Sequence, residues 1–326
     1  MTRRPALAIL ATGIVCLSSL LAAPSTHAAY PERPVSLISP WEAGGSTTIF
    51  GRLLTDGLSQ RTGQSFVFEN KPGAAGNIGT QFVARSAPDG HTLLIGSMST
   101  HVLQPALGTS TPFHPVDSFT PIARLGTVTN SLAVRHDLPV KSVAELIAYA
   151  KANPGKISYA SAGVGSSLHL GAAQFEELAK VEMLHVPYKG ASRAAQATAA
   201  GETDIVFTSV ALTAPYVQSK RLRTLAVAQP QRSGLMPDVP TVAETLPGFD
   251  LSIWYGLFAP SGLPPEIAAA LARWSGEIGA TPEAQARLQQ LGMEVNVLPG
   301  EAFTPLIHQQ SQQWRTRIST LGIKVE

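Results

Sequence analysis

The sequence predicts an α/β protein made of two lobes, each a parallel sheet with helices on both faces. The chain has 326 residues, more than a single hydrophobic core usually organises, so two domains of roughly 100 to 150 residues are expected. Short β-branched runs alternate with segments of helical periodicity, a pattern typical of strands joined by crossover helices. An apolar fraction of 44% with 28 Gly and 25 Pro indicates a folded chain with many turns.

Seven compact apolar runs are predicted as strands. They span residues 35–39, 65–69, 92–95, 157–160, 183–186, 204–207 and 223–228. Extended segments at 131–135 and 251–259 add one strand each. We therefore expect a discontinuous first lobe, residues 29–130 plus 250–326, and a second lobe, residues 131–249. Two crossings would then join the lobes and leave a ligand cleft between them.

Two helices are predicted most clearly from their apolar spacing. Residues 166–179 and 299–321 each carry one apolar stripe. The stripes consist of Leu168, Ala172, Phe175 and Ala179 in the first, and Phe303, Ile307, Trp314, Ile318 and Leu321 in the second. A single stripe on each helix indicates one buried face and one solvated face. We expect both stripes to belong to the core and not to a ligand site.

The N-terminus has the pattern of a secretory signal peptide. Arg3 and Arg4 precede an apolar stretch at 6–23, and small residues before and at Ala28 favour cleavage there. A membrane anchor is the alternative. Polar residues and Pro24 interrupt the stretch, which favours a cleaved signal. We expect an exported protein that begins near residue 29.

Cysteine and charge content agree with an exported protein that binds no polyanion. Cys16, the only cysteine, lies within the predicted signal, and the preceding Val15 argues against a lipid anchor. Without Arg3 and Arg4, the 24 Lys and Arg fall to 22 and equal the 22 Asp and Glu. A neutral chain without a basic run argues against nucleic acid or an anionic membrane as partner.

Two loops carry the predicted binding chemistry, since ligands of open α/β sheets bind at the carboxyl ends of strands. Residues 40–48 and 161–167 each follow a strand, contain glycines and hydroxyls, and open a helix. Their candidate residues are Trp41, Gly44, Gly45, Ser46, Thr47 and Thr48 in the first loop, and Ser161, Gly163, Gly165 and Ser166 in the second. Backbone donors at a helix N-terminus suit a carboxylate. The alternative is that these loops are glycine turns with Ser and Thr N-caps and no ligand.

Catalytic, metal and nucleotide sites are not indicated. The glycine cluster at 73–79 lacks GxGxxG and P-loop spacing, so a structural turn into a helix is expected. Residues 163–167 do not form GxSxG. The eight histidines show neither HExxH nor any pair at i, i+4. We therefore predict a protein that is not an enzyme, with no catalytic residue, metal or cofactor.

From Tyr30 to its end the chain resembles the Bug family, the extracytoplasmic receptors of tripartite tricarboxylate transporters. The shared motifs are Tyr30-Pro31 with Arg33-Pro34, Gly44-Gly45-Ser46-Thr47, the run 69–79, Pro88-Asp89-Gly90-His91-Thr92-Leu93, Asn153-Pro154-Gly155-Lys156, Gly163-Val164-Gly165-Ser166 with His169, Pro187-Tyr188-Lys189-Gly190, and Asp238-Val239-Pro240-Thr241 with Glu244. So many motifs in one register make coincidence improbable.

The resemblance implies a type II periplasmic-binding-protein fold, or Venus flytrap, that closes on a small mono- or dicarboxylate. In such receptors the two loops clamp a carboxylate, partly through water. It further implies ligand contacts from Ser97 and Ser99, which lie in the loop 97–101, and from His169, Thr208 and Ser209. The implied partner is a membrane permease of the tripartite tricarboxylate type, and the implied state is a periplasmic monomer.

Two departures from the family pattern leave the ligand open. Thr48 stands where relatives usually carry an acidic residue, which puts recognition of a ligand ammonium in doubt. Trp41 and Glu42 stand where relatives carry small residues or Pro. Glu42 either restores an acidic partner or points to solvent. Trp41 either stacks on an aromatic acid or packs against the hinge, and packing is favoured.

Two other functions remain open on the sequence alone. One is a sensory role, in which the closed receptor presents the carboxylate to a membrane histidine kinase. The other is an exported hydrolase or lyase acting on a carboxylate in the same cleft.

Overall fold

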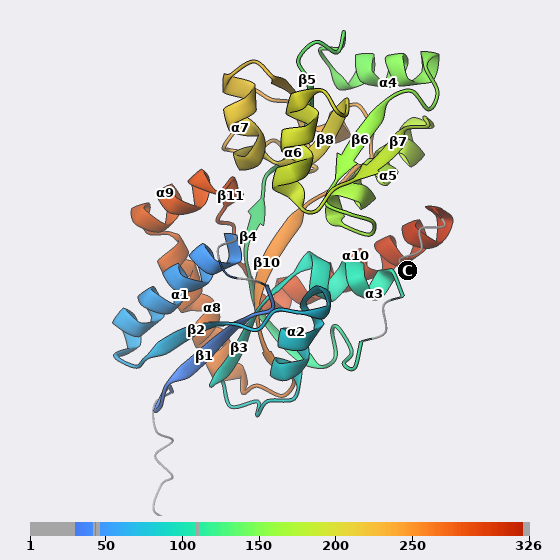
Figure 1. Cartoon of the computed structure of the whole chain (residues 1–326). Coiled ribbons are helices and arrows are strands. Elements are labelled where there is room, and N and C mark those ends of the chain that lie inside the picture. Colours follow the sequence, from blue (N-terminus) through green and yellow to red (C-terminus); the bar gives the residue numbers. More distant parts are fainter. Residues whose placement is uncertain (1–29, 42, 44–45, 109–110, 322–326) are drawn as a thin grey trace, which may run out of the picture.

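The computed structural model describes residues 30–321, except 42, 44–45 and 109–110 (Figure 1). The predicted signal peptide, residues 1–28, lies outside this part of the chain. Among the described helices, none has the length and apolar character needed to cross a bilayer. The chain forms two sheets, each covered by helices on both faces, so the predicted two-sheet α/β fold is confirmed.

Sheet A has the strand order β11-β4-β10-β3-β1-β2, with β12 also paired to β4. Its strands are β1 (Val35–Ser39), β2 (Phe66–Asn70), β3 (Thr92–Ser97), β4 (Phe119–Val128), β10 (Ile253–Pro260), β11 (Met293–Glu294) and β12 (Leu298–Pro299). Strands β1, β2 and β3 are parallel, whereas β10 runs antiparallel to both of its neighbours.

Helices cover both faces of sheet A. They are α1 (Ser46–Thr62), α2 (Asn77–Ala84), α8 (Pro265–Gly279), α9 (Pro282–Gln290) and α10 (Gly300–Leu321), with the short turns η2 (Ala74–Gly76), η3 (Ser99–Leu103) and α3 (Gln104–Ala106). Successive residues of β3 alternate between two cores: Leu93 and Ile95 pack with α1 and α8, and Leu94 packs with α2 and α10. This alternation is expected of a strand buried on both faces.

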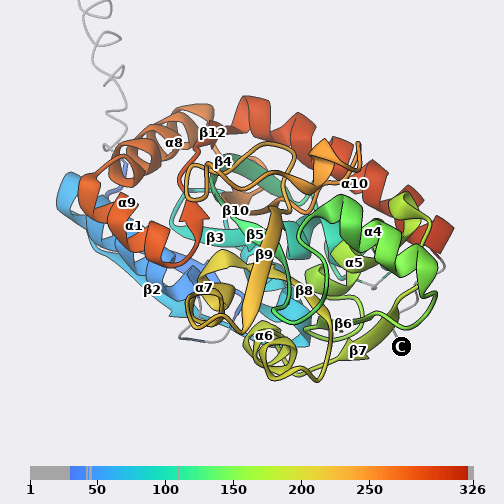
Figure 2. The ribbon, with the colours of Figure 1, turned by 90° about the horizontal axis from the view of Figure 1, so that it is seen from above.

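Sheet B has the order β7-β6-β8-β5-β9. Its strands are β5 (Asn130–Arg135), β6 (Ser158–Ser161), β7 (Leu184–Pro187), β8 (Ile205–Ser209) and β9 (Leu222–Val227). Its helices are α4 (Val143–Ala152), α5 (Ser167–Ala179), α6 (Ala191–Ala200) and α7 (Val210–Gln218), followed by η4 (Val242–Glu244). One core lies under α4 and α5, and the other lies on the opposite face of the sheet under α6 and α7 (Figure 2).

The two sheets share one topology. We call sheet A with its helices lobe 1, and sheet B with its helices lobe 2. The chain passes from lobe 1 to lobe 2 between Val128 and Asn130, and it returns between Leu251 and Ile253. Strand β10 enters sheet A from lobe 2, and strand β5 enters sheet B from lobe 1. When the short strand β11 is left aside, each of these two strands lies second from one end of its sheet. The equivalent sets are therefore β2-β1-β3-β10-β4 and β7-β6-β8-β5-β9.

The nine predicted strands and the two predicted helices all lie on observed elements, within two residues at most boundaries. The expectation of fully parallel sheets is wrong, because β5 and β10 are antiparallel to the strands beside them. The sequence also failed to indicate β4, a ten-residue strand. Pro121, Arg124 and Gly126 interrupt its apolar pattern, so neither alternation nor a continuous apolar run marks it.

The apolar stripes of α5 and α10 are core, as predicted, except for Leu321, which is only half-buried at the end of α10. Phe175 of α5 is fully buried with Phe207 and Phe249 in lobe 2, and Phe303 of α10 packs edge-on against Trp254 at 4.8 Å. The glycine cluster at 73–79 is the predicted structural turn, forming η2 and the start of α2.

Gly292 lies at a close contact between the lobes. Its φ is +68°, and an added Cβ would lie 2.8 Å from Ser209 Oγ and 3.1 Å from the backbone N of Ala211, both in lobe 2. Gly155 has nearly the same φ, +69°, and no described atom would lie within 4 Å of its Cβ. Alanine substitutions at Gly292 and Gly155 therefore share the same backbone strain, and only the one at Gly292 adds a steric clash.

We expect Gly292→Ala to lower the free energy of unfolding by about 2 kcal/mol more than Gly155→Ala does, because only the first adds a clash to the left-handed backbone. Urea denaturation of both variants measures the difference. Equal losses would show that the turn at 291–292 does not pack tightly against the start of α7.

Candidate functional site

Strand direction brings the predicted loops to one place. Strand β4 runs parallel to β1 and β3, because β10 is antiparallel to both β3 and β4, and β4 ends at the crossing between the lobes. Strand β5 starts at that crossing and runs antiparallel to β8, which is parallel to β6. The carboxyl ends of β1, β3, β6 and β8 therefore all face the boundary between the lobes (Figure 1). The loops 40–48, 97–101, 161–169 and 208–209 begin at these ends.

In lobe 1, Trp41 lies across the ends of three parallel strands. Its carbonyl accepts a hydrogen bond from Asn70 Nδ2 at 2.8 Å. A Cβ added at Gly76 would lie 3.4 Å from the Trp41 ring and 3.0 Å from Thr100, so the glycine leaves room for the indole. The ring thus packs within lobe 1, between the loops that follow β1, β2 and β3.

The remainder of the first loop is described only in part. Glu42, Gly44 and Gly45 lie outside the described residues, so the structure does not decide between the two roles expected for Glu42. Ser46 begins α1, and the side chains of Thr47 and Thr48 are buried in its first turn. The N-terminus of a helix of 17 residues therefore points toward the lobe boundary, as predicted.

The turn after β3 holds an unsatisfied hydroxyl. Ser97 is 2% exposed, and its Oγ has no hydrogen-bond partner among the described residues. Its backbone N–H donates to Thr100 Oγ1 at 3.0 Å, which also lies 2.8 Å from His101 Nδ1. Ser99 opens η3 and is half-buried. A buried hydroxyl without a protein partner is normally satisfied by a ligand or by ordered water.

The His101 ring packs in the core of lobe 1 beneath this turn. The ring is fully buried and stacks on Phe258 with 4.0 Å between centroids. Burial lowers the pKa of His101 to about 3, so the imidazole is neutral at physiological pH.

In lobe 2, the hydroxyls of the second loop are occupied by the loop itself. Ser166 Oγ donates to the carbonyl of Gly163 at 2.7 Å and accepts from the backbone N–H of His169 at 3.3 Å, so Ser166 is the N-cap of α5. Ser161 Oγ accepts from the backbone N–H of Gly163 at 3.1 Å. The expected N-cap is therefore real for Ser166. The donors left for a ligand are the first backbone N–H groups of α5, at Ser167 and Leu168, which have no acceptor within the helix.

His169, a predicted ligand residue, also holds this loop. Its Nδ1 accepts the backbone N–H of Gly165 at 3.1 Å, which requires the neutral ring with the proton on Nε2. Burial, and secondarily the neighbouring His185, lowers the pKa of His169 to about 4. The neutral form is thus the stable one above that pH.

Two residues of this region were missed in the sequence. The ring of His185 on β7 lies parallel to that of His169, with 4.1 Å between centroids, and parallel to that of Tyr159 on β6 at 4.9 Å. His185 Nε2 lies 2.6 Å from Ser161 Oγ. Tyr159 and His185 are direct neighbours in the register of β6 and β7. No local pattern indicates that pairing.

The end of β8 repeats the arrangement seen at β3. Thr208 is 1% exposed, and its Oγ1 lacks a hydrogen-bond partner within the described chain. Ser209 differs, because its Oγ accepts from the N–H of Ala211 as the N-cap of α7 and lies 3.5 Å from the carbonyl of Leu291 in lobe 1. Ser209 is therefore a contact between the lobes, and Thr208 is the residue with spare hydrogen-bonding capacity.

The chemistry of the assembled site suits an anion. Helices α1, α5 and α7 all begin at the lobe boundary, so the positive ends of three helix dipoles point there. In α7 the first two N–H groups already donate to the carbonyl of Thr129 and to Ser209 Oγ. Ser97 and Thr208 occupy equivalent strands of the two lobes and add one hydroxyl each. In the described residues, no group of three His, Cys, Asp or Glu is placed to hold a metal ion.

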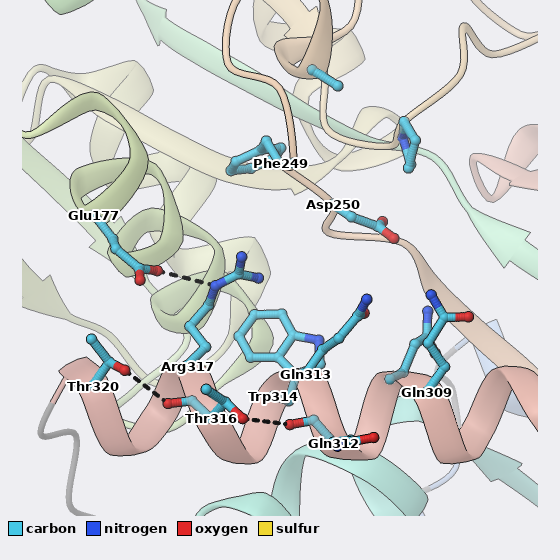
Figure 3. Close-up of a pocket in the computed structure, with 14 residues that line it drawn as sticks. Glu177, Phe249, Asp250, Gln309, Gln312, Gln313, Trp314, Thr316, Arg317 and Thr320 are labelled. Carbon is cyan, nitrogen blue, oxygen red and sulfur yellow. Dashed lines mark hydrogen bonds and ion pairs between the residues drawn. The ribbon is translucent and has the colours of Figure 1, made fainter.

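A separate hollow lies between α10 and lobe 2 (Figure 3). It has a volume of about 810 Å³ and includes none of the predicted site residues. Arg317 Nε of α10 lies 3.1 Å from a carboxylate oxygen of Glu177 on α5 across this hollow, as Figure 3 shows. Helix α5 therefore touches lobe 1 through Glu177 and carries the second loop at its other end.

Comparison with known proteins identifies relatives along almost the whole chain. A family model described as the tripartite tricarboxylate transporter family receptor matches residues 50–323. A UPF0065 protein encoded in the tcbD-tcbE intergenic region of Pseudomonas sp. strain P51 is 34% identical over 292 residues, 89% of this chain and 87% of the relative. BugT of Bordetella pertussis strain Tohama I is 31% identical over 316 residues, 96% of this chain and 97% of BugT.

Solved structures are similar in fold over the same range. A TctC solute-binding protein from Polaromonas without ligand has a TM-score of 0.80 at 31% identity, covering 89% of this chain and 99% of that one. Rpa4515 of R. palustris with adipate has a TM-score of 0.77 at 31% identity, covering 90% and 99%. MatC of Rhodopseudomonas palustris with bound malate has a TM-score of 0.72 at 31% identity, covering 89% and 100%. The type II periplasmic-binding-protein fold implied by the sequence motifs is confirmed.

The neutral state of His169 predicts a pH effect on stability. The pKa of His169 is about 4 in the folded protein, against 6.5 for a solvent-exposed histidine in the unfolded chain. As pH falls below 6.5, the unfolded chain takes up a proton that the folded chain refuses, so stability falls with pH until about pH 4. This linkage amounts to about 2 kcal/mol between pH 7 and pH 5.

We expect His169→Gln to remove about this amount from the pH dependence of the unfolding free energy, measured by urea titration at pH 7 and pH 5. His136→Gln, which changes an exposed histidine of the same lobe, should leave the dependence unchanged. If His169→Gln and wild type lose the same stability between pH 7 and pH 5, the conclusion that His169 is neutral in the folded protein is wrong.

Proposed function

This chain belongs to the tripartite tricarboxylate transporter receptor family, whose members are periplasmic solute-binding proteins, and we propose that it captures a small carboxylate and delivers it to a membrane permease of the tripartite tricarboxylate type. The ligand lies between the lobes, where α1, α5 and α7 begin. Closure of the lobes is a hinge motion at the two crossings, and the bound ligand shifts the population toward the closed form.

The observation that carries this proposal is the pair of buried hydroxyls, Ser97 Oγ and Thr208 Oγ1, at the carboxyl ends of equivalent strands in the two lobes. Neither has a hydrogen-bond partner in the described structure. Helix N-termini that favour negative charge flank both residues. Two relatives with the same fold hold adipate and malate, which are small dicarboxylates. A carboxylate ligand satisfies both the unpaired hydroxyls and the free backbone N–H groups.

We assign the role of each site residue by whether its hydrogen-bonding groups already have partners within the protein. The backbone of the loops 44–48 and 163–168 binds one carboxylate, and Ser97 and Thr208 bind the remainder of the ligand. Trp41 forms an apolar wall on the lobe 1 side. Ser99 and Ser209 lie at the rim of these groups, and Ser161, Ser166 and His169 act by shaping the second loop.

The protein is proposed to bind its ligand without transforming it. Ser161 and His185 are 2.6 Å apart, a contact that also occurs in Ser–His hydrolases. Ser161 is fully buried, however, and its Oγ already accepts the N–H of Gly163. The Ser161 hydroxyl is therefore engaged in holding the second loop and is not set up as a nucleophile. Mass spectrometry of the ligand after incubation should return it intact.

The cellular setting is part of the same proposal. Residues 1–28 act as a signal peptide that is cleaved near Ala28, and the mature protein works in the periplasm as a monomer. The lobe boundaries are those expected from the sequence, residues 29–130 plus 250–326 and residues 131–249. They are supported by the crossings at 128–130 and 251–253.

Substitution of the two free hydroxyls tests the site. We expect Ser97→Ala and Thr208→Val each to weaken carboxylate binding by about 10- to 100-fold, because each loses one hydrogen bond to a charged ligand, about 1.5 to 3 kcal/mol. Stability should be unchanged or slightly raised, since a buried unpaired hydroxyl is removed. Calorimetric titration with a panel of mono- and dicarboxylates that includes malate and adipate measures both affinity and selectivity.

Ser275→Ala is the matched control. Ser275 is also a buried hydroxyl, but its Oγ donates to the carbonyl of Leu271 within α8. That variant should lose stability and keep its affinity. Wild-type protein that binds no member of the panel at millimolar concentration would refute the proposed function, and unchanged affinity in both site variants would refute the assignment of the residues.

A further inference from the structure

The loops proposed to hold the ligand carry no positively charged side chain. None of the segments 40–48, 97–101, 161–169 and 208–209 contains Lys or Arg. An anion removed from water needs compensation, and a helix N-terminus supplies only about 0.3 to 1 kcal/mol, up to about 2 kcal/mol when partly buried. Lys189 follows β7 in the chain, but it is exposed, so water and salt screen its charge.

Beneath the second loop lies a group that can gain a positive charge. His185, His169 and Tyr159 form a packed set of nearly parallel rings, with interplanar angles of 7° to 14°. Two of the rings connect directly to the loop. His169 Nδ1 accepts the N–H of Gly165, and His185 Nε2 lies 2.6 Å from Ser161 Oγ. The loop that is proposed to hold the carboxylate is therefore attached to two imidazoles.

Only one of these imidazoles can take up a proton without damage to the loop. Two parallel rings 4.1 Å apart cannot both be charged. Protonation of His169 at Nδ1 would break its bond to Gly165. His185 instead faces a hydroxyl, which can act as donor or acceptor. His185 is also half-buried, whereas His169 is buried.

We propose that the receptor takes up one proton at His185 when it binds its carboxylate, so that the positive charge absent from the loops is supplied from solvent. This inference rests on the proposed function and adds a proton as the second ligand of the same site.

The hydrogen bonds rearrange without loss. In the charged state His185 Nε2–H donates to Ser161 Oγ. The Ser161 hydroxyl then donates to the carbonyl of Gly163, 3.2 Å away, and still accepts the N–H of Gly163. The proton comes from solvent and stays on the imidazole ring. The loop keeps its shape while an imidazolium lies beneath it.

In the described part of the chain, the ring contacts and the hydrogen bond of His185 come from β6 and α5. Tyr159 and Ser161 face it from β6, and His169 faces it from α5. Burial lowers the pKa of His185 below its usual value, so the ring is neutral at pH 7 before ligand binds. Glu176 of α5 shares a hydrogen bond with Tyr159, and burial raises the pKa of Glu176 to about 7. Glu176 is therefore the other group that could take up a proton when the ligand binds.

Calorimetry at pH 7 in two buffers of different ionisation enthalpy counts the protons taken up on binding. The probe is the tightest-binding member of the carboxylate panel that includes malate and adipate. For wild type we expect a net uptake of about half a proton at pH 7, and an affinity that falls about 5- to 10-fold from pH 6 to pH 8.

His185→Gln is the decisive variant, since an amide can still hydrogen-bond to Ser161 but cannot titrate. It should bind with no proton uptake and with equal affinity at pH 6 and pH 8. Glu176→Gln and the exposed His136→Gln should both behave as wild type.

The outcomes separate this inference from the proposed function. Tight binding by wild type without proton uptake would overturn the role of His185 and leave the receptor function intact. Proton uptake that persists in His185→Gln and disappears in Glu176→Gln would show that Glu176 takes up the proton. That outcome would also overturn the inference. Failure of wild type to bind any carboxylate would overturn the proposed function itself.

Discussion

The pairing of each crossing strand inside the sheet of the lobe that it enters is the constraint on which the remaining structure depends. Strand β10 lies between β3 and β4, and β5 lies between β8 and β9. Because both are antiparallel to their neighbours, the parallel strands of each lobe must end at the boundary that the chain crosses. The turns and helix N-termini that follow those strands then face one another. The position of the candidate site is thus a consequence of strand direction, and the side chains refine a position that the backbone has already set.

Local pattern was enough to predict most of this fold. Compact runs such as 35–39 and 204–207 are buried on both faces, so their apolar character shows in the sequence. Strand direction is a different kind of property, because it depends on which distant segment lies beside a strand. The antiparallel β5 and β10 could therefore not be distinguished from their parallel neighbours. Strand β4 escaped notice for a local reason, since Pro121 and Gly126 break the pattern by which a strand is recognised.

The candidate site shows the same difference between what local sequence predicts and what depends on distant neighbours. The sequence placed both loops correctly at strand ends, because glycine and hydroxyl residues before a helix have a local physical meaning. It could not tell which hydroxyls are free. Ser166 and Ser209 are used as N-caps, whereas Ser97 and Thr208 are left without partners among the described residues. It also could not find Tyr159 and His185, whose contact with the second loop depends on the register of β6 against β7.

A site made of neutral donors has a consequence for a receptor that must release its ligand. A fixed Arg paired with the carboxylate would hold it strongly at every stage, since breaking a buried charge pair is costly. On our proposal, the His185 imidazole gains its charge only when the anion is present and gives a weaker and reversible hold. The charge can leave with the ligand, because the ring returns to its neutral stacked state beside His169. Binding strength on this proposal depends on pH as well as on ligand concentration, and opening of the lobes releases the carboxylate and the proton together.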